Sequence, residues 1–464
     1  MKQSTKVTAA LLAGSTFLSV PAWAQESFYT KAAEPYAGTT IRILDEVTPL
    51  QEKVFDIIPQ FEELTGITVE LELLGHAEVI NRGQADMLSG RGFYDGVMMH
   101  NYQLAPMLTA GVIRSIDDYV ADPALSDPDF NADDLIQRPY TTTSFTGGKQ
   151  YGFNNWNYNE VYWARADLFA HPEEQAAFNE KYGYDLGPAE TITQMRDIAE
   201  FFTRDAGETL AGETLEADFY GIVLEGIKGG STFPTLWSAL IKNYGGRLLD
   251  ENGAPAFDSP ETVEALTMWA ELWSFAPPGI AEYSLVDVPT VMGNGLAAQT
   301  LAWSDFVFGV DVPGASPYAG DFVYGPIPFK DGREEERSVE ADVSVVVISE
   351  ASENPEATFL FLQWLASEEA QAALIEAGNG GVPIRQSSWE LPAIADSEMT
   401  SLYAAMRSTL DVAEAKPKMP DSFEIMDAMS GIAQEVGLGR LTPEEGAAQG
   451  QAAMLEICTQ CLMQ

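Results

Sequence analysis

Apolar positions in the first part of the chain follow two alternating periods. Over residues 51–64 they recur at helical spacing, so that Val54, Phe61 and others share one face. Over residues 67–74 apolar and polar residues alternate, which is typical of a half-buried strand. The predicted strands cover residues 39–44, 67–74 and 96–101, and the predicted helices cover residues 51–64 and 78–88. Strands that alternate with helices predict βαβ units with a parallel sheet, and therefore an α/β fold.

The rest of the chain continues in the same mixed pattern. Ser259, followed by a proline, stands before an amphipathic run and predicts a helix with a serine N-cap, whose Trp269 and Trp273 we expect in the core. Asn252 and Gly253 are a hairpin signal between two short strand-like runs. Further helices are predicted at residues 188–204 and 354–367, and further strands at residues 219–226, 247–258 and 344–349.

Polar residues follow each of three predicted strands. In parallel sheets, ligands bind in the crevice beyond the carboxyl ends of the strands. The segments concerned are DEVT at 45–48, GHAE at 75–78 and HNYQ at 100–103. From them we expect ligand contacts by Glu46, His76, Asn101 and Gln103. The alternative interpretations are a solvated loop acid, a surface imidazole and amides that only form turns.

Residues 1–24 have the parts of a secretory signal peptide. Lys2 and Lys6 form the basic start, an apolar run too short to span a bilayer follows, and Ala22-Trp23-Ala24 is the cleavage motif. Gln25 stands where a lipoprotein would have a cysteine, and no later uncharged apolar run is long enough to cross a membrane. We therefore expect a soluble, exported protein. The chain that remains is too long for one hydrophobic core and predicts two lobes.

The charge of the chain excludes two classes of partner. The 464 residues carry 70 acidic against 25 basic side chains, a net charge of −45, and such a surface repels nucleic acid and anionic membranes. The acidic segment 117–134 suggests a calcium loop, but it has Ala132 where glycine is required and Arg138 where glutamate is required. We interpret this segment as a solvated loop.

Rare residue types argue against a metal or redox centre. The 3 histidines, His76, His100 and His171, are scattered along the sequence, so we expect no metal and no cofactor. Cys458 and Cys461 form a CTQC motif near the end of the chain, whereas a redox C-x-x-C motif belongs near the start of a βαβ unit. Whether these cysteines close a local disulfide stays open at this point.

Several segments, taken in order, resemble the extracellular solute-binding proteins of bacterial ABC importers, in the carbohydrate-binding family that includes the maltose-binding protein. The segments are FEELTGITVELE, YGFNNWNYNEVYWARADLF, PAETITQMRDIA, NYGGRLLDENGAPAFDSPETVEAL, APPGIAEYSLVDVPTVMGNGLAAQTLAW, SENPEATFLFLQWLASEEAQ and GGVPIRQSS. The resemblance covers residues 39–440. Pro277-Pro278-Gly279 with Tyr283 resembles the members that take sugars or sugar alcohols.

The resemblance implies two α/β lobes that are joined by crossover strands and close on a ligand by a hinge. Lobe 1 is expected at 38–150 plus 335–376, lobe 2 at 155–330 plus 382–460, and the hinge near 151–156. The aromatic, asparagine-rich stretch 151–163 then divides into a crossing strand, a short ligand contact, and a second strand that leads into a helix. The implied function is a monomeric periplasmic component that captures a neutral sugar, oligosaccharide or polyol and delivers it to ABC permease subunits.

A sugar presents apolar C–H faces and hydroxyls that both donate and accept, so its pocket needs flat aromatic surfaces beside amides and carboxylates. Besides the loop residues named above, the resemblance points to Asn155, Trp156, Phe233, Trp237, Trp303, Asp305 and Arg385. Each has a structural alternative. The aromatic residues can be ordinary core, and Arg385 can pair with one of the many acids.

Two other function classes stay open. A secreted carbohydrate-active enzyme needs two carboxylates that flank one bond, but with 70 acids some such pair is inevitable, and no G-x-S-x-G nucleophile motif is present. The same fold can also bind a non-sugar solute. A phosphorylated polyol needs basic residues, and the proposed site has few besides Arg385 and Lys228. A cation, such as an amino-sugar or a polyamine, is compatible with Glu46 and Asp305.

Overall fold

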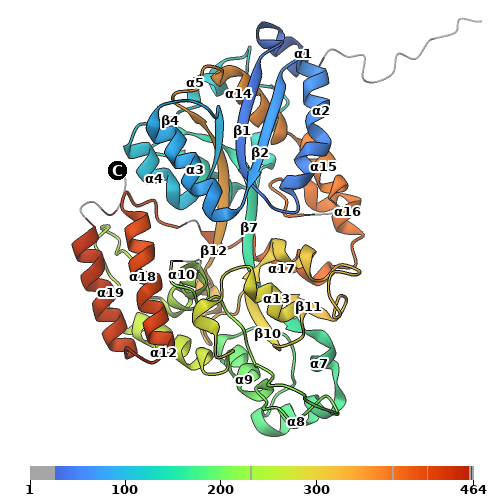
Figure 1. Cartoon of the computed structure of the whole chain (residues 1–464), viewed down its shortest axis with the longest axis vertical. Helices are drawn as coiled ribbons and strands as arrows, with labels where there is room; N and C mark the ends of the chain where they lie inside the picture. The colour runs from blue at the N-terminus through green and yellow to red at the C-terminus, as the bar shows by residue number, and fades with distance from the viewer. Residues whose placement is uncertain (1–26, 230–231, 379–380, 415, 459–460, 462–464) are drawn as a thin grey trace, which may run out of the picture.

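The computed structural model describes residues 27–229, 232–378, 381–414, 416–458 and 461. The expected signal peptide at residues 1–24 lies outside the described residues. Figure 1 shows two masses stacked along the long axis, with the N-terminal elements in blue at the top and the middle of the chain in green and yellow below. Within the described ranges, no helix is long and apolar enough to cross a membrane.

The upper mass is built on a sheet whose first three strands are parallel. β1 (Thr40–Glu46) lies between β2 (Thr68–Leu74) and β3 (Gly96–His100) and pairs in parallel with both. The helices that follow these strands are α2 (Val54–Thr65), α3 (His76–Ser89) and α4 (Asn101–Thr109). The predicted βαβ pattern is confirmed. Because the strands are parallel, their carboxyl ends meet at one edge of the sheet.

Two long strands join the upper and lower masses (Figure 1). β7 (Gly152–Arg165) is continuous over 14 residues, all buried, and β12 (Val339–Ser349) runs antiparallel to it. β12 also pairs with β3 above, whereas the second half of β7 pairs with β10 (Gln299–Trp303) and β11 (Phe322–Gly325) below. The fold is therefore a two-lobed α/β structure in which β7 and β12 cross between the lobes. The lobe boundaries given above stay a prediction.

Two clusters of buried apolar side chains form the core. The first packs β1, β3 and β12 against α2 and α14 (Pro355–Leu365) and includes Ile43, Phe61 and Phe359. The second lies below, among α9 (Ile192–Phe202), α12 (Pro260–Trp273), α18 (Ser422–Gly437) and α19 (Pro443–Ile457). The serine N-cap is confirmed, because Ser259 Oγ accepts the Thr262 N–H at 3.2 Å. Trp269 and Trp273 are buried in the second cluster, as expected.

Three local predictions are wrong. Residues 219–226 do not form a regular strand. They make isolated bridges to β10 and to the residues just before it, Tyr220 with Ala297 and Val223 with Thr300. Residues 247–258 form the predicted turn, in which Asp250 N–H donates to the Ala254 carbonyl at 2.8 Å, but not the predicted strands. The two runs make a single bridge, between Leu249 and Pro255, and Pro255 has no N–H to extend a ladder. Residues 152–163 belong to the one strand β7, and do not divide into a crossing strand followed by a second strand and a helix start. Because β7 is covered on both faces, its asparagines and its aromatics are both buried.

Two further segments have structure that the sequence did not predict in full. The acidic segment 117–134, expected as a loop, contains the short helices α5 (Asp117–Ala121) and η4 (Ala132–Asp134). Cys458 and Cys461 form a disulfide across a Cα–Cα distance of 5.2 Å, which ties the end of the chain to the end of α19.

Candidate functional site

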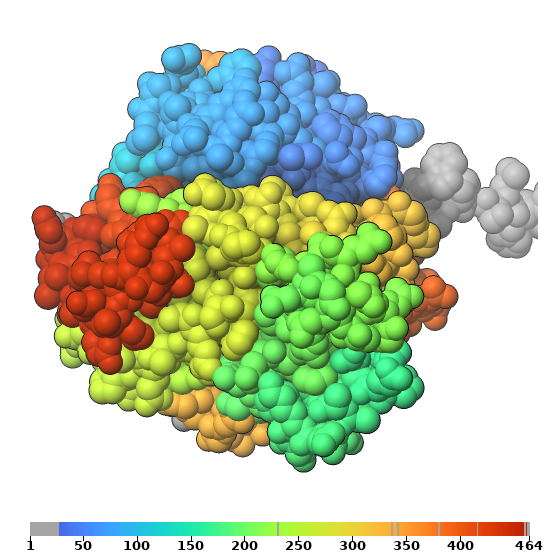
Figure 2. Space-filling model, turned by 60° about the horizontal axis from the view of Figure 1, so that its bottom comes forward, coloured from blue at the N-terminus to red at the C-terminus, as the bar shows by residue number. Residues whose placement is uncertain are grey.

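The candidate site is a cavity between the lobes. Its volume is about 290 Å³, and its walls come from α3 and Tyr102 of the upper lobe and from Glu225, Trp303 and α18 of the lower lobe. A second cavity of about 40 Å³ adjoins it and shares His76, Leu285 and Trp303. Figure 2 shows the blue N-terminal part of the chain resting on the yellow and red segments that supply the opposite wall.

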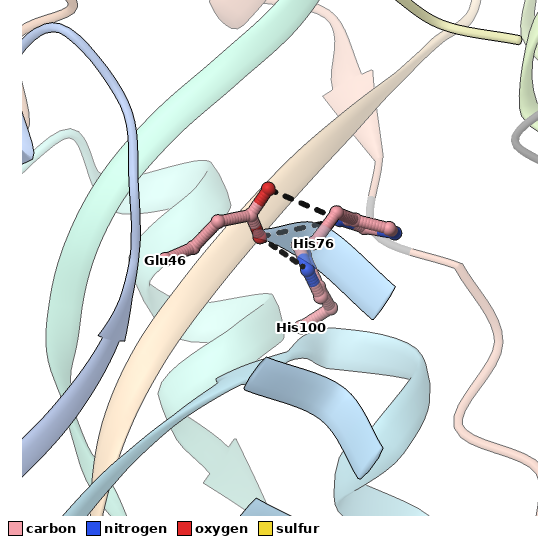
Figure 3. Close-up of side chains that lie close together, drawn as sticks. All are labelled: Glu46, His76 and His100. Carbon is pink, nitrogen blue, oxygen red and sulfur yellow. Dashed lines mark hydrogen bonds and ion pairs between the residues drawn. The ribbon is translucent and has the colours of Figure 1, made fainter. Parts of the chain in front are cut away.

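The three loops at the carboxyl ends of β1, β2 and β3 converge, as expected from the parallel sheet. Glu46 ends β1, His76 begins α3 after β2, and His100 ends β3. Figure 3 shows both imidazole rings pointing at the Glu46 carboxylate. His76 Nδ1 lies 3.1 and 3.2 Å from its two oxygens, and His100 Nε2 lies 3.1 Å from Oε2. Burial would raise the pKa of Glu46, but the hydrogen bonds from His100 and His76 outweigh it and lower the pKa to about 2.

Packing holds the ring of His100 in place. The ring stacks on Tyr102, with centroids 5.3 Å apart and planes within 4°, and meets the edge of Trp156 at 6.3 Å. The backbone N–H of His100 donates to Gln103 Oε1 at 2.8 Å, which fixes the start of α4. His100 is 2% exposed, whereas the side chain of His76 is 32% exposed and reaches into both cavities.

Asp45, next to Glu46, turns the other way. Its carboxylate accepts hydrogen bonds from the side-chain amides of Gln51 and Asn155 and from the backbone N–H of Glu46. Burial raises the pKa of Asp45 to about 7, although these hydrogen bonds lower it. Because β1 alternates its side chains, Glu46 faces the cavity while Asp45 ties β1 to β7.

Aromatic side chains form the wall of the smaller cavity. Trp156 and Tyr158 of β7 stack with centroids 5.1 Å apart, and the Tyr158 hydroxyl pairs with Thr48 Oγ1 at 2.8 Å. Trp303 lines both cavities from the end of β10, and Asp305 lines the smaller one from the turn that follows. Flat aromatic surface beside a carboxylate is the combination that a sugar or polyol needs.

The far wall of the larger cavity comes from the C-terminal part of the chain. Phe423, Met426 and Asp427 project from α18, and Phe423 meets the Tyr102 ring edge-on at 5.9 Å. Lys416 Nζ forms an ion pair with Glu340 at 3.1 Å and lies 4.7 Å from the centroid of Tyr102. Lys416, the one lysine among the described residues of this wall, is thus paired with a buried acid, while Glu225 and Asp427 are further acids of the lining.

The structure brings five of the sequence-predicted site residues to the cavities, namely Glu46, His76, Trp156, Trp303 and Asp305. Three predicted amides lie just behind the walls. Asn155 bonds Asp45 and Gln51, Asn101 Nδ2 donates to the backbone oxygen of Lys416 at 3.1 Å, and Gln103 caps α4. These amides hold other residues in position and do not line the two cavities.

The structure corrects three other expectations. Phe233 and Trp237 stack on each other at 5.9 Å in the core of the lower lobe, and the cavity touches only Pro234 between them. Arg385 is fully buried away from the cavities. Its guanidinium pairs with Asp134 at 3.1 Å and donates to the backbone oxygens of residues 130, 131 and 366. The ion-pair interpretation of Arg385 therefore holds, because all its donor groups are occupied by structural partners.

Sequence reasoning missed several residues of the site. His100 and Tyr102 belong to the HNYQ segment, at the carboxyl end of β3, and this position would have been enough to predict them as site residues. Lys416, Phe423, Met426 and Asp427 carry no such signal. Lys416 lies before α18 and the other three lie on it, more than 300 residues after β3. The histidines at positions 76 and 100, which looked scattered along the sequence, meet on one carboxylate.

Comparisons with known proteins agree with this architecture. An erythritol/L-threitol-binding protein of Mycolicibacterium smegmatis is 23% identical over 372 residues, which are 76% of this chain and 72% of that protein. A probable amino-acid ABC transporter periplasmic-binding protein of Sinorhizobium fredii is 24% identical over 430 residues, 90% of this chain and 88% of that one.

Solved structures share the fold. An ABC transporter solute-binding protein of Agrobacterium radiobacter K84, solved in complex with ribitol, superposes with a TM-score of 0.74 at 23% identity and covers 90% of this chain and 98% of its own. The sequence model of the family described as bacterial extracellular solute-binding protein matches residues 47–372. Because that match spans well over half of the chain, and the two-lobed fold with its interlobe cavity agrees with it, the protein belongs to the bacterial extracellular solute-binding proteins.

Proposed function

We propose that the protein is the periplasmic substrate-binding component of an ABC importer and that it captures a small neutral carbohydrate, a monosaccharide or a linear polyol. The solute binds in the interlobe cavity and is handed, as the lobes open, to the membrane permease. The protein acts as a monomer and is exported by the leader at residues 1–24. The family, the two-lobed fold and the cavity support this proposal.

The combination of aromatic and polar side chains that line the cavity is the main observation in support of the proposal. Trp303, Tyr102 and Phe423 offer apolar aromatic faces, while His76, Glu225 and Asp427 offer hydrogen-bonding groups around the same space. Aromatic faces stack on C–H surfaces, and the polar groups can accept from or donate to hydroxyls. A volume of about 290 Å³ is near the lower end of the range of ligand pockets, roughly 300–1,000 Å³. The size favours one sugar unit or a short polyol over an oligosaccharide.

The relatives support the same solute class. One is named for erythritol and L-threitol, and a structure with the same fold holds ribitol. These are small, linear and uncharged polyols. Their chemistry matches a cavity with several hydroxyl-binding groups and one neutralised lysine.

Titration calorimetry tests the proposal. The purified chain is titrated with erythritol, threitol, ribitol, mannitol, glucose and maltose. We expect one-to-one binding of at least one linear polyol or monosaccharide at micromolar affinity, and weaker binding of maltose. If no member of the panel binds more tightly than about 1 mM, the solute class is wrong.

A cationic or zwitterionic solute is the second candidate. Glu225, Asp427 and Asp305 line the cavities and offer carboxylate oxygens to a positively charged group of a solute. The relative from Sinorhizobium fredii is named as a probable amino-acid-binding component. Adding an amino acid, an amino-sugar and putrescine to the same titrations separates this candidate from a neutral polyol.

An enzymatic role is the least supported alternative. A carbohydrate-active enzyme needs two carboxylates on either side of a scissile bond. The two acids among the described residues that line the smaller cavity are Glu46, which is hydrogen-bonded to two histidines, and Asp305. We expect recovered solute to be chemically unchanged after prolonged incubation with the protein, and sustained turnover of a glycoside would contradict the binding role.

A further inference from the structure

We propose that Glu46, His76 and His100 form a binding site for a divalent transition metal, with Zn²⁺ as the preferred ion, and that its open coordination positions face the solute cavity. The proposal rests on the position and chemistry of three side chains and is independent of which solute the cavity binds. It goes beyond solute capture, because it assigns a metal to a cleft for which the sequence suggested none.

The three donor atoms already lie within the reach of one ion. One donor atom from each of the three residues can be chosen so that all lie within 4.8 Å of one another, and Oε2 of Glu46 lies 3.2 Å from His76 Nδ1 and 3.1 Å from His100 Nε2. In a tetrahedral zinc site with bonds of about 2.0–2.2 Å, neighbouring ligand atoms lie about 3.3 Å apart. Two of the three edges are therefore formed (Figure 3), and the third, between the two imidazole nitrogens, is at most 4.8 Å, so we expect the more exposed His76 ring to move when the ion binds.

The donor set selects the class of ion. Two imidazoles and one carboxylate are a ligand set of zinc sites that keep a position open for water or substrate, and of non-haem iron(II) sites. Ca²⁺ and Mg²⁺ prefer oxygen ligands throughout, so this set disfavours them. Two of the 3 histidines of the chain converge on one glutamate, although 24 residues separate them in sequence.

The surroundings hold the ligands in position. His100 is clamped between Tyr102 and the edge of Trp156, and Glu46 lies at the end of a strand whose neighbouring residue, Asp45, is anchored by Gln51 and Asn155. Such outer contacts orient metal ligands and raise metal affinity. Two of the three ligands are therefore held before the ion arrives, and only His76 has to adjust.

The remaining coordination positions open toward the solute. All three residues line the 40 Å³ cavity together with Asp305, and His76 also lines the 290 Å³ cavity. A zinc ion with three protein ligands keeps at least one position for an oxygen donor. The chemistry that fits this opening is a molecule with two adjacent oxygens, such as a vicinal diol or an α-hydroxy acid, which chelates the ion. This consequence for the solute, unlike the metal site itself, rests on the proposed function.

The same three side chains also form a complete hydrogen-bonded cluster when both rings donate to Glu46. In that arrangement the cluster only offers polar groups to a solute and has no special affinity for zinc. One measurement distinguishes the metal site from the hydrogen-bonded cluster, namely whether the purified chain binds one equivalent of metal through these residues.

Metal binding is measured on the purified chain without a polyhistidine tag and without reductant, so that neither a tag nor free thiols bind zinc. After treatment with a chelator, the chain is titrated calorimetrically with ZnCl₂, and Co²⁺ is added in parallel for its visible absorption, which reports tetrahedral coordination. We expect one ion per chain. His76→Ala and Glu46→Gln should each weaken zinc binding by more than the roughly 10–100-fold that loss of an outer-shell partner costs.

The matched control is His171→Ala, which removes the third histidine, at the start of α8 (Pro172–Tyr182) in the lower lobe and outside both cavities. It should leave zinc affinity unchanged, and the melting temperatures of all variants confirm that they fold. The proposal is overturned if the wild-type chain binds zinc no more tightly than about 1 mM, or if His76→Ala and His171→Ala bind it equally well. Polyol titrations with chelator separate the two proposals, because polyol binding without zinc binding leaves the proposed function intact and removes the metal site.

Discussion

The side-chain amide of Asn155 donates to both oxygens of the Asp45 carboxylate, at 3.0 and 2.9 Å. Asp45 lies one residue before the end of β1, and Asn155 lies near the start of the crossing strand β7, so this pair fastens the edge of the upper sheet to a crossover. Gln51 bonds both members of the pair and closes a buried polar network. Behind the cavity, the network holds the strand end that presents Glu46.

Asn155→Ala should destabilise the protein. The change removes both donors that Asn155 gives to a buried carboxylate and leaves Gln51 as the one side-chain donor to it among the described residues. A buried charged group that loses its partner costs about 1–3 kcal/mol or more, and we expect about 2 kcal/mol in urea unfolding. The exposed Asn252→Ala is the control and should cost under about 0.5 kcal/mol. Solute affinity should change little, and a loss of affinity larger than the loss of stability would place Asn155 in direct contact with the solute.

Trp303 should contribute to affinity, and Trp237 to stability. Trp303→Phe removes part of the aromatic surface that lines both cavities, whereas Trp237→Phe makes the same change in the core of the lower lobe. We expect the first variant to weaken polyol binding by about tenfold, or about 1.4 kcal/mol, in calorimetry. The second should lower the free energy of unfolding by about 1–2 kcal/mol with the affinity unchanged. Equal affinities for the two variants would move Trp303 into the core.

The local pattern of apolar and polar residues was sufficient to predict the sheet of the upper lobe. β1, β2 and β3 each have a strand-like pattern, and each is followed by a helix that packs beside it. The convergence of Glu46 and His76 follows from the same rule, since parallel strands end at one edge. The stretch 151–163 was not recognised as one strand, because the alternation of aromatic and asparagine residues is interrupted at Asn154-Asn155, where β7 shifts register against β12, and because both faces of the strand are buried. Nothing in its residues marks where one lobe ends and the other begins.

The parts of the site that depend on contacts between residues far apart in sequence could not be predicted. Trp237 and Trp303 both stand in apolar segments near polar residues, and only their tertiary neighbours distinguish core from cavity wall. Arg385 forms an ion pair with Asp134, which lies 251 residues away in sequence, and no local sequence pattern indicates this pairing. The same limit applies to α18, whose Phe423 and Asp427 face the cavity because the C-terminal helices return to the lobe boundary.

Glu160 should make the stability depend on pH. Burial raises the pKa of Glu160 to about 7, although hydrogen bonds from Ser238 and Thr235 lower it. The unfolded chain releases this proton near pH 4.5, so the folded state binds more protons between about pH 4.5 and 7. The contribution of this carboxyl therefore favours folding most below about pH 4.5, declines as the pH rises to about 7, and stays constant above it.

Glu160→Gln removes this dependence. The free energy of unfolding of the variant, minus that of the wild type, should rise by on the order of 2 kcal/mol between pH 5 and 8 when measured by urea unfolding. The control Glu63→Gln, on an exposed position of α2, should follow the wild-type profile. A difference between Glu160→Gln and the wild type that does not change with pH would show that Glu160 keeps its proton, or its charge, throughout this range.

Arg385 should be a stability residue that leaves binding untouched. Its side chain is fully buried, pairs with Asp134 and lies over the ring of Phe130. Arg385→Ala therefore removes the ion-pair partner of a partly buried acid, which keeps hydrogen bonds from Ser387, and takes one donor from each of three backbone oxygens. Breaking a buried pair in this way costs about 3–5 kcal/mol. Arg407→Ala breaks an exposed pair with Glu390 at 4.0 Å and should cost less than about 1 kcal/mol. In the folded fraction of both variants the solute dissociation constant should equal that of the wild type, because neither arginine lines a cavity, and a selective loss of affinity in Arg385→Ala would return this residue to the site.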